Sequence, residues 1–101
     1  MLNLEKKYIT VIKKILAAYI PQTEVWVYGS RIKNTSHSGS DLDLVIISTV
    51  SQKELSLVRN AFSESQLPIL VDLLEWETLP DNFKADIQSS HAVIYRPNSN
   101  A

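Results

Sequence analysis

The 101-residue sequence lacks cysteine, any concentrated group of basic residues and any long apolar run. Without cysteine the chain can form neither disulfides nor thiolate metal sites, which leaves the redox compartment unconstrained. Ten Lys and Arg residues are scattered among eleven Asp and Glu residues, so nucleic acid is not expected as a direct partner. The apolar runs fall far short of the roughly 20 residues that cross a bilayer, and the first residues do not resemble a signal peptide. We therefore expect a cytoplasmic protein with no membrane partner.

A chain of this length can bury one modest core. We expect a single domain over residues 1–96, followed by a flexible tail at 97–101. There is no room for a separate substrate domain, so the recognition of an acceptor should depend on a partner.

Hydrophobic periodicity predicts alternating helices and strands around one sheet. The capping-box pattern of Ser51 and Glu54 predicts the start of one helix, with Leu55, Val58 and Phe62 on its inner face. The expected elements are a helix at 3–20, a strand at 24–28, a helical turn and loop at 30–40, a strand at 42–47, the helix after 51, a strand at 69–75, a helix from 80 and a strand at 92–95. The nearly continuous apolar run at 42–47 is typical of a strand buried on both faces.

The motif most informative about function lies in residues 28–44, which read YGSRIKNTSHSGSDLDL. Gly29 and Ser30 follow an apolar strand and can present N–H groups and a hydroxyl to a phosphate. Asp41 and Asp43 lie two residues apart in the next strand, so they point to the same face. Two such carboxylates, roughly 7 Å apart along the strand, suit Mg²⁺ better than zinc. Either half alone is typical of an ordinary turn or a solvent-facing pair, but the combination predicts a nucleotide site.

Asp72 is an acid inside an otherwise apolar predicted strand. We expect it to be buried, and a buried carboxylate needs a cation or strong hydrogen-bond donors. If its strand lies beside the strand of Asp41 and Asp43, the three carboxylates would form one cluster able to hold two Mg²⁺ ions. Glu75 and Glu77 are nearby alternatives, but strand alternation places Glu75 on the opposite face.

These residues resemble the minimal nucleotidyltransferases, small members of the DNA polymerase β-like superfamily that act as antitoxins of HEPN-domain toxins. The resemblance lies in Gly29-Ser30 followed by Ser40-Asp41-Leu42-Asp43-Leu44, and it continues through PILVDLLEWETLPDNFKADIQSSHAVIYR. It implies an α/β (α+β) fold with a small mixed sheet of about four strands flanked by helices. Ile32, Asn34 and the pair Ser90-His91 depart from the family pattern, and none of them removes an expected metal ligand.

The resemblance also implies roles for individual residues. Asp41, Asp43 and Asp72 would be the catalytic residues and the ligands of two Mg²⁺ ions, while nucleotide phosphates would contact Gly29, Ser30, Arg31 and Ser40. The expected reaction transfers a nucleotide, AMP from ATP, to a hydroxyl of a cognate HEPN toxin. Lys33 is a further candidate for offsetting the charge of the leaving group.

Two other functions stay open at this point. The protein could neutralise the toxin by binding alone, with a weak or inactive site. It could also be a Mg²⁺ enzyme of the Toprim type, although that class needs a glutamate where this chain has Gly29-Ser30. Four aromatic and histidine residues remain. The simpler interpretation of His37 is a solvated loop residue, that of His91 is a contact with a helix end, and that of Trp26 is a core residue. Trp76 could instead belong to a partner interface.

Overall fold

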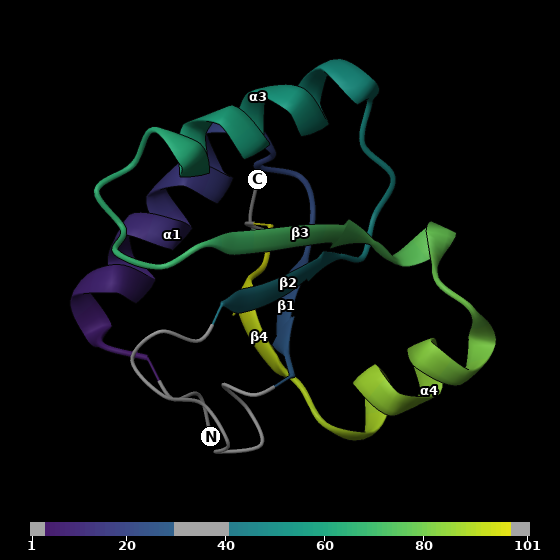
Figure 1. The fold of residues 1–101 in the computed structure, drawn as a ribbon. Helices are drawn as coiled ribbons and strands as arrows, with labels where there is room; N and C mark the ends of the chain where they lie inside the picture. Colours follow the sequence, from purple (N-terminus) through teal and green to yellow (C-terminus); the bar gives the residue numbers. More distant parts are fainter. Residues whose placement is uncertain (1–3, 30–40, 98–101) are drawn as a thin grey trace.

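The computed structural model describes residues 4–29 and 41–97, which form a four-stranded sheet flanked by helices (Figure 1). The elements are α1 (Lys6–Tyr19), β1 (Val25–Tyr28), β2 (Leu42–Ile46), α3 (Gln52–Ser63), β3 (Val71–Glu75), the 3-10 helix η1 (Trp76–Thr78), α4 (Asp81–Ser89) and β4 (Ala92–Tyr95). The predicted order of helices and strands is confirmed in these ranges. The turn expected at 30–40 and most of the expected tail lie outside the described residues.

The sheet is mixed, with the strand order β3-β2-β1-β4. β1 pairs antiparallel with both β2 and β4, whereas β2 and β3 are parallel. β2 is therefore an inner strand, and its residues Leu42, Leu44, Val45 and Ile46 are fully buried. This confirms the burial on both faces that its apolar run predicted, and the α+β fold class with a small mixed sheet is confirmed as well.

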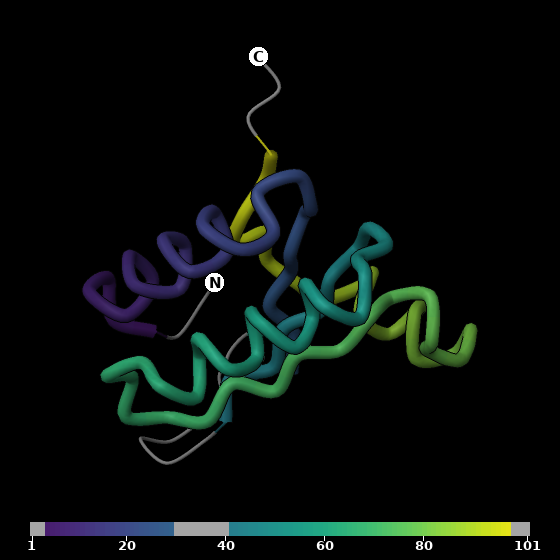
Figure 2. Tube along the Cα trace, turned by 90° about the horizontal axis from the view of Figure 1, so that it is seen from above, coloured from purple at the N-terminus to yellow at the C-terminus, as the bar shows by residue number. Residues whose placement is uncertain are grey.

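The two faces of the sheet are covered unequally. α1 and α3 lie side by side over one face, whereas the much shorter α4 lies on the other side of the sheet (Figures 1 and 2). The larger core packs the first face and includes Leu16, Leu44 and Val58. The smaller core, around Tyr28, Val45 and Ile87, packs the α4 face. Part of the α4 face is therefore left free for a site.

α3 begins with the capping box that the sequence predicted. The Ser51 hydroxyl accepts a hydrogen bond of 3.0 Å from the backbone N–H of Glu54, and the Glu54 carboxylate accepts one of 3.0 Å from the Ser51 N–H. Two N–H groups that the helix cannot satisfy internally are paired in this way. Leu55, Val58 and Phe62 are buried, as the predicted inner face requires.

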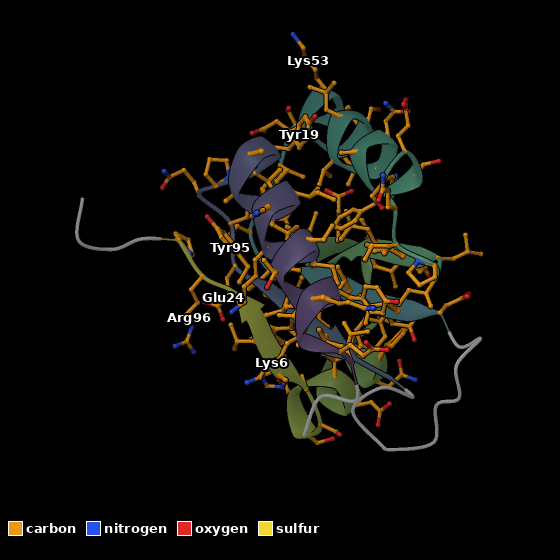
Figure 3. The ribbon with its side chains drawn as sticks, turned by 90° about the vertical axis from the view of Figure 1, so that its left-hand side faces the viewer. Lys6, Tyr19, Glu24, Lys53, Tyr95 and Arg96 are labelled. Atoms are coloured by element: carbon orange, nitrogen blue, oxygen red, sulfur yellow. The ribbon has the colours of Figure 1, made fainter. Side chains whose placement is uncertain are left out.

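The end of β4 is tied to the turn before β1, at the edge of the sheet shown in Figure 3. The Tyr95 hydroxyl donates a 3.0 Å hydrogen bond to the carbonyl oxygen of Pro21. Arg96 Nε lies 3.7 Å from Glu24 Oε1, in an exposed ion pair that adds little stability by itself. These contacts hold the C-terminal strand against β1.

An aromatic group on the α4 face settles two of the weaker sequence interpretations. The Trp26 and His91 rings are stacked with centroids 3.9 Å apart, and Trp76 meets Trp26 edge-on at 5.5 Å. His91 Nδ1 donates to the carbonyl oxygen of Ile87, near the end of α4. Trp26 therefore belongs to the smaller core and His91 caps a helix end, as expected.

In the described part of the chain, no helix is long and apolar enough to cross a membrane.

Candidate active site

Three strands bring the predicted site residues to one end of the sheet. β1 ends at Tyr28, directly before Gly29, while β2 and β3 both begin at this end. The register pairs Tyr28 with Asp43 across the antiparallel strands, and Asp43 with Asp72 across the parallel strands. Tyr28, Asp43 and Asp72 therefore form a row across the sheet, which we call the Asp43 row.

The Asp43 row faces the side of the sheet that carries α4. Val45 and Leu74 pack in the smaller core of that face. Because side chains alternate along a strand, Asp43 shares the face of Val45, and Asp72 shares the face of Leu74. Asp41 directly precedes β2 and is exposed. The sheet itself thus brings two of the three predicted carboxylates side by side, with the third next to them along the chain.

Gly29 holds the turn at the end of β1 against the Asp43 carboxylate. Its φ of 82° lies in the left-handed region, which a residue with a side chain adopts only at a cost. A Cβ added to Gly29 would lie 2.5 Å from Asp43 Oδ2. Both the backbone conformation and the space beside it therefore require glycine, and the turn and the carboxylate form one packed unit.

The negative charges of the site act on one another. Partial burial, followed by the neighbouring carboxylates of Asp72 and Asp41, raises the pKa of the Asp43 carboxyl above its usual range. Burial, followed by the charges of Asp43 and Asp72, likewise raises the pKa of the Tyr28 hydroxyl. Among the described residues, no Lys or Arg side chain forms an ion pair with any of the three carboxylates. The site therefore concentrates negative charge without an opposing basic group in this part of the chain.

The structure corrects the expectation that Asp72 is buried. Asp72 is exposed, because β3 is an edge strand and α4 does not cover its beginning. The three carboxylates are also not grouped as closely as the ligands of a bound metal ion. Within residues 4–29 and 41–97, no three His, Cys, Asp or Glu side chains stand close enough together to hold a metal ion.

The structure thus places Gly29, Asp41, Asp43 and Asp72 at one end of the sheet, as expected. The other predicted contacts, Ser30, Arg31 and Ser40, lie outside the described residues, as do Lys33 and His37. Our sequence analysis missed Tyr28 as a member of the site. Its position directly before Gly29 could have indicated this, because the strand that carries the turn also carries the residue paired with Asp43.

The raised pKa of Asp43 predicts a pH dependence of stability. The folded protein disfavours the ionised form of Asp43. At low pH, where Asp43 is protonated in both the folded and the unfolded protein, this destabilisation is absent. The free energy of unfolding should fall as the pH rises from about 4, the usual value for an aspartate, through the raised pKa. We expect urea unfolding in buffer with EDTA to show this fall in the wild type and not in Asp43→Asn. Parallel pH profiles for the two proteins would contradict the raised pKa of Asp43.

Comparisons with known proteins agree with this geometry. Residues 10–100 match the family model "Polymerase beta, Nucleotidyltransferase". The chain is 39% identical over 95 residues to a probable protein adenylyltransferase MntA of Haemophilus influenzae, a match that covers 92% of this chain and 83% of that protein.

Solved structures share the fold. A toxin–antitoxin structure with AMP-PNP superposes with a TM-score of 0.71 at 19% identity, covering 91% of this chain and 76% of that chain. The complex of a tri-AMPylated Shewanella oneidensis HEPN toxin with its MNT antitoxin superposes with a TM-score of 0.65 at 17% identity, covering 96% and 76%. At these identities the likeness concerns the arrangement of helices and strands.

Proposed function

Because the chain belongs to the polymerase β nucleotidyltransferase family and has its fold, we propose that it transfers AMP from ATP to a hydroxyl of a cognate HEPN-domain toxin, and so acts as an antitoxin. The observation that carries the enzymatic part is the contact between the Gly29 turn and the Asp43 carboxylate, with Asp72 next in the row. The protein acceptor is supported by the adenylyltransferase relative and by the shared fold with an antitoxin bound to an AMPylated toxin.

The carboxylates fit a hard divalent cation. They supply only oxygen donors, burial followed by their mutual repulsion raises the pKa of Asp43, and no basic side chain of the described ranges neutralises them. Asp41 and Asp43 would be ligands of two Mg²⁺ ions, and Asp72 would be a ligand of one of them. When bound, such ions neutralise triphosphate charge and make a hydroxyl easier to deprotonate.

The chain's own residues would position the two reactants. Gly29 allows close approach of the backbone to the triphosphate. The neighbouring Ser30, Arg31 and Ser40 would contact its phosphates, and Asp72 would accept the proton of the attacking hydroxyl. A bond forms between the acceptor oxygen and the α-phosphorus as the bond to the bridging oxygen breaks, and pyrophosphate leaves with the electron pair.

The test is incubation with a candidate cognate HEPN-domain toxin, Mg²⁺, and ATP labelled at either the α- or the γ-phosphate. We expect the α-label to appear on the toxin, and the γ-label to remain in pyrophosphate. Transfer of the γ-label would indicate a kinase instead. If neither label appears on the toxin and the toxin is still neutralised, the enzymatic proposal is overturned. An antitoxin that acts by binding alone would then be favoured.

A further inference from the structure

The helix pair α1 and α3 carries an open groove. The two helices lie side by side and run in opposite directions (Figure 2). The groove has a volume of about 510 Å³ and is lined by Val11, Ile15 and Tyr19 of α1, by Asn60 and Ala61 of α3, and by Glu64, Ser65 and Gln66 of the turn after α3. The three residues of α1 are spaced by four, so they form one row about 12 Å long. The groove is therefore about two helical turns in length.

Apolar side chains of this groove are exposed on the side away from the sheet. Leu16 and Val58, which pack in the core of the α1 and α3 face, are fully buried. By contrast, Tyr19 is 41% exposed and Leu57 is 45% exposed. Leu57 lies one helical turn before Ala61, so it extends the apolar wall of the groove along α3. The groove thus has an apolar centre that the fold itself does not use as core.

The fold gathers basic residues on these two helices. α1 and α3 carry six of the ten Lys and Arg residues and only one of the eleven Asp and Glu residues. That one acid is Glu54, whose carboxylate is engaged in the capping box. The helix layer is therefore basic, although the whole chain has a net charge of -1. The acids of the Asp43 row belong to the other face of the sheet.

Two lysines flank the apolar centre of the groove. Lys14 follows Val11 by three residues, and Lys53 precedes Leu57 by four residues, so each lysine is a neighbour of an apolar residue on its helix. Lys53 and Tyr19 lie at the same end of the helix pair (Figure 3). In the part of the chain that the structure describes, neither lysine has an ion-pair partner. Both ammonium groups are therefore available to acidic groups of a partner.

These features together favour one kind of occupant. An apolar centre with a charged rim is typical of protein interfaces, whereas binding to a nucleic-acid backbone depends on dense positive charge. A second copy of this chain would place two basic surfaces against each other, and like charges across an interface are unfavourable. Glu64, the acid that lines the groove, accepts a 3.2 Å hydrogen bond from the Asn60 side chain. A groove between two helices suits a third helix with an apolar stripe.

We propose that the α1 and α3 groove docks an amphipathic helix of the cognate toxin, with acidic residues on both sides of its apolar stripe. The apolar side chains would pack against Ile15, Tyr19 and Leu57, and the acids would pair with Lys14 and Lys53. The groove lies on the face of the sheet opposite the Asp43 row, so a toxin held here leaves that row open to an acceptor hydroxyl. This inference rests on the proposed function and deepens it, because it defines the surface that recognises the protein substrate.

The first test measures the Kd of a candidate cognate HEPN-domain toxin for the wild type, Leu57→Asp and Ser56→Asp. Both positions are exposed on α3, but Leu57 lies about 40° from Ala61 around the helix axis and Ser56 about 140° from it. Ser56→Asp is therefore a matched control that adds the same charge outside the groove. Leu57→Asp should raise the Kd about tenfold or more, and Ser56→Asp should leave it close to the wild-type value. The affinity for ATP, measured without toxin, should stay unchanged in both variants.

Lys14→Glu tests the charge of the occupant. The Kd of the toxin for the wild type should rise with ionic strength, because salt screens the pairing of lysines with acids. Lys14→Glu should weaken binding at low salt and reduce this dependence on salt. A Kd that changes with neither salt nor Lys14→Glu would contradict an acidic partner.

The outcomes separate this inference from the function on which it rests. An unchanged Kd in Leu57→Asp, with AMP transfer by the wild type, would overturn docking in the groove and leave the transferase standing. Docking would stand without the enzymatic part if Leu57→Asp weakens toxin binding and the wild type transfers no AMP. Absence of toxin binding by the wild type would overturn both.

Two other occupants would also overturn the proposal. Concentration-dependent dimerisation of the wild type that Leu57→Asp abolishes, seen by sedimentation, would assign the groove to a second copy. Binding of a short RNA oligonucleotide that Lys14→Glu abolishes, with an unchanged Kd for the toxin, would assign it to nucleic acid.

Discussion

Replacing Asp43 with asparagine is expected to reduce AMP transfer by about a thousandfold or more, without unfolding the protein. Asparagine has nearly the same size but carries no charge to hold a metal ion at the centre of the Asp43 row. At neutral pH it also removes a carboxylate disfavoured by burial and by Asp72 and Asp41. The melting temperature should therefore stay equal or rise, while the stabilisation that Mg²⁺ adds to the wild type is lost. Single-turnover transfer and thermal unfolding with and without Mg²⁺ measure both effects.

Asp81→Asn is the matched control for this substitution. Asp81 is an exposed aspartate in the first turn of α4 and has no place in the Asp43 row. Its replacement should leave both the rate of transfer and the Mg²⁺ effect close to the wild-type values. Transfer at a wild-type rate by Asp43→Asn would contradict the assignment of Asp43 as a catalytic residue.

Gly29→Ala should impair both stability and activity. The positive φ costs a residue with a side chain roughly 1 to 2 kcal/mol, and the new Cβ would lie 2.5 Å from Asp43 Oδ2. The carboxylate must then move, and a displacement of about 1 Å at a reacting centre can reduce the rate about a hundredfold. We expect a lower free energy of unfolding in urea and a loss of transfer of at least that size.

A double-mutant cycle separates the two causes of this loss. In an Asp43→Ala background the added Cβ no longer meets a carboxylate, so Gly29→Ala should cost less stability than it does in the wild type. The loss of stability that remains in this background would measure the cost of the backbone conformation alone. An equal cost in both backgrounds would show that contact with Asp43 does not matter to the requirement for glycine.

Local patterns predicted the elements well, because the interactions that form them span only a few residues. Ser51 and Glu54 lie three residues apart, and their reciprocal hydrogen bonds form wherever the helix begins. The apolar residues around Asp43 in β2 indicate burial on both faces, since a side chain in an inner strand meets a packed layer on either side. The motif of Gly29, Asp41 and Asp43 was also visible in the sequence, but the contact between Gly29 and Asp43 was not, because it joins two different strands.

The expectation for Asp72 was wrong because burial depends on position in the sheet. A run of apolar residues does not distinguish an inner strand from an edge strand that a helix covers on one face. β3 is at the edge, where α3 covers one face and α4 leaves the beginning of the other face exposed. Neither the strand order nor the reach of a helix of nine residues can be read from the strand itself.

By itself the sequence determined the order of the helices and strands, the glycine at the turn after β1, and the presence of two acids on strands, with a third directly before one of them. Only the tertiary structure decided that β3 lies parallel to β2 with Asp72 opposite Asp43, and that the Asp43 carboxylate packs against Gly29. The physical reason is one of range. Backbone geometry and side-chain alternation act between neighbours in the chain, whereas strand order and cavities result from the packing of apolar faces that lie far apart in it.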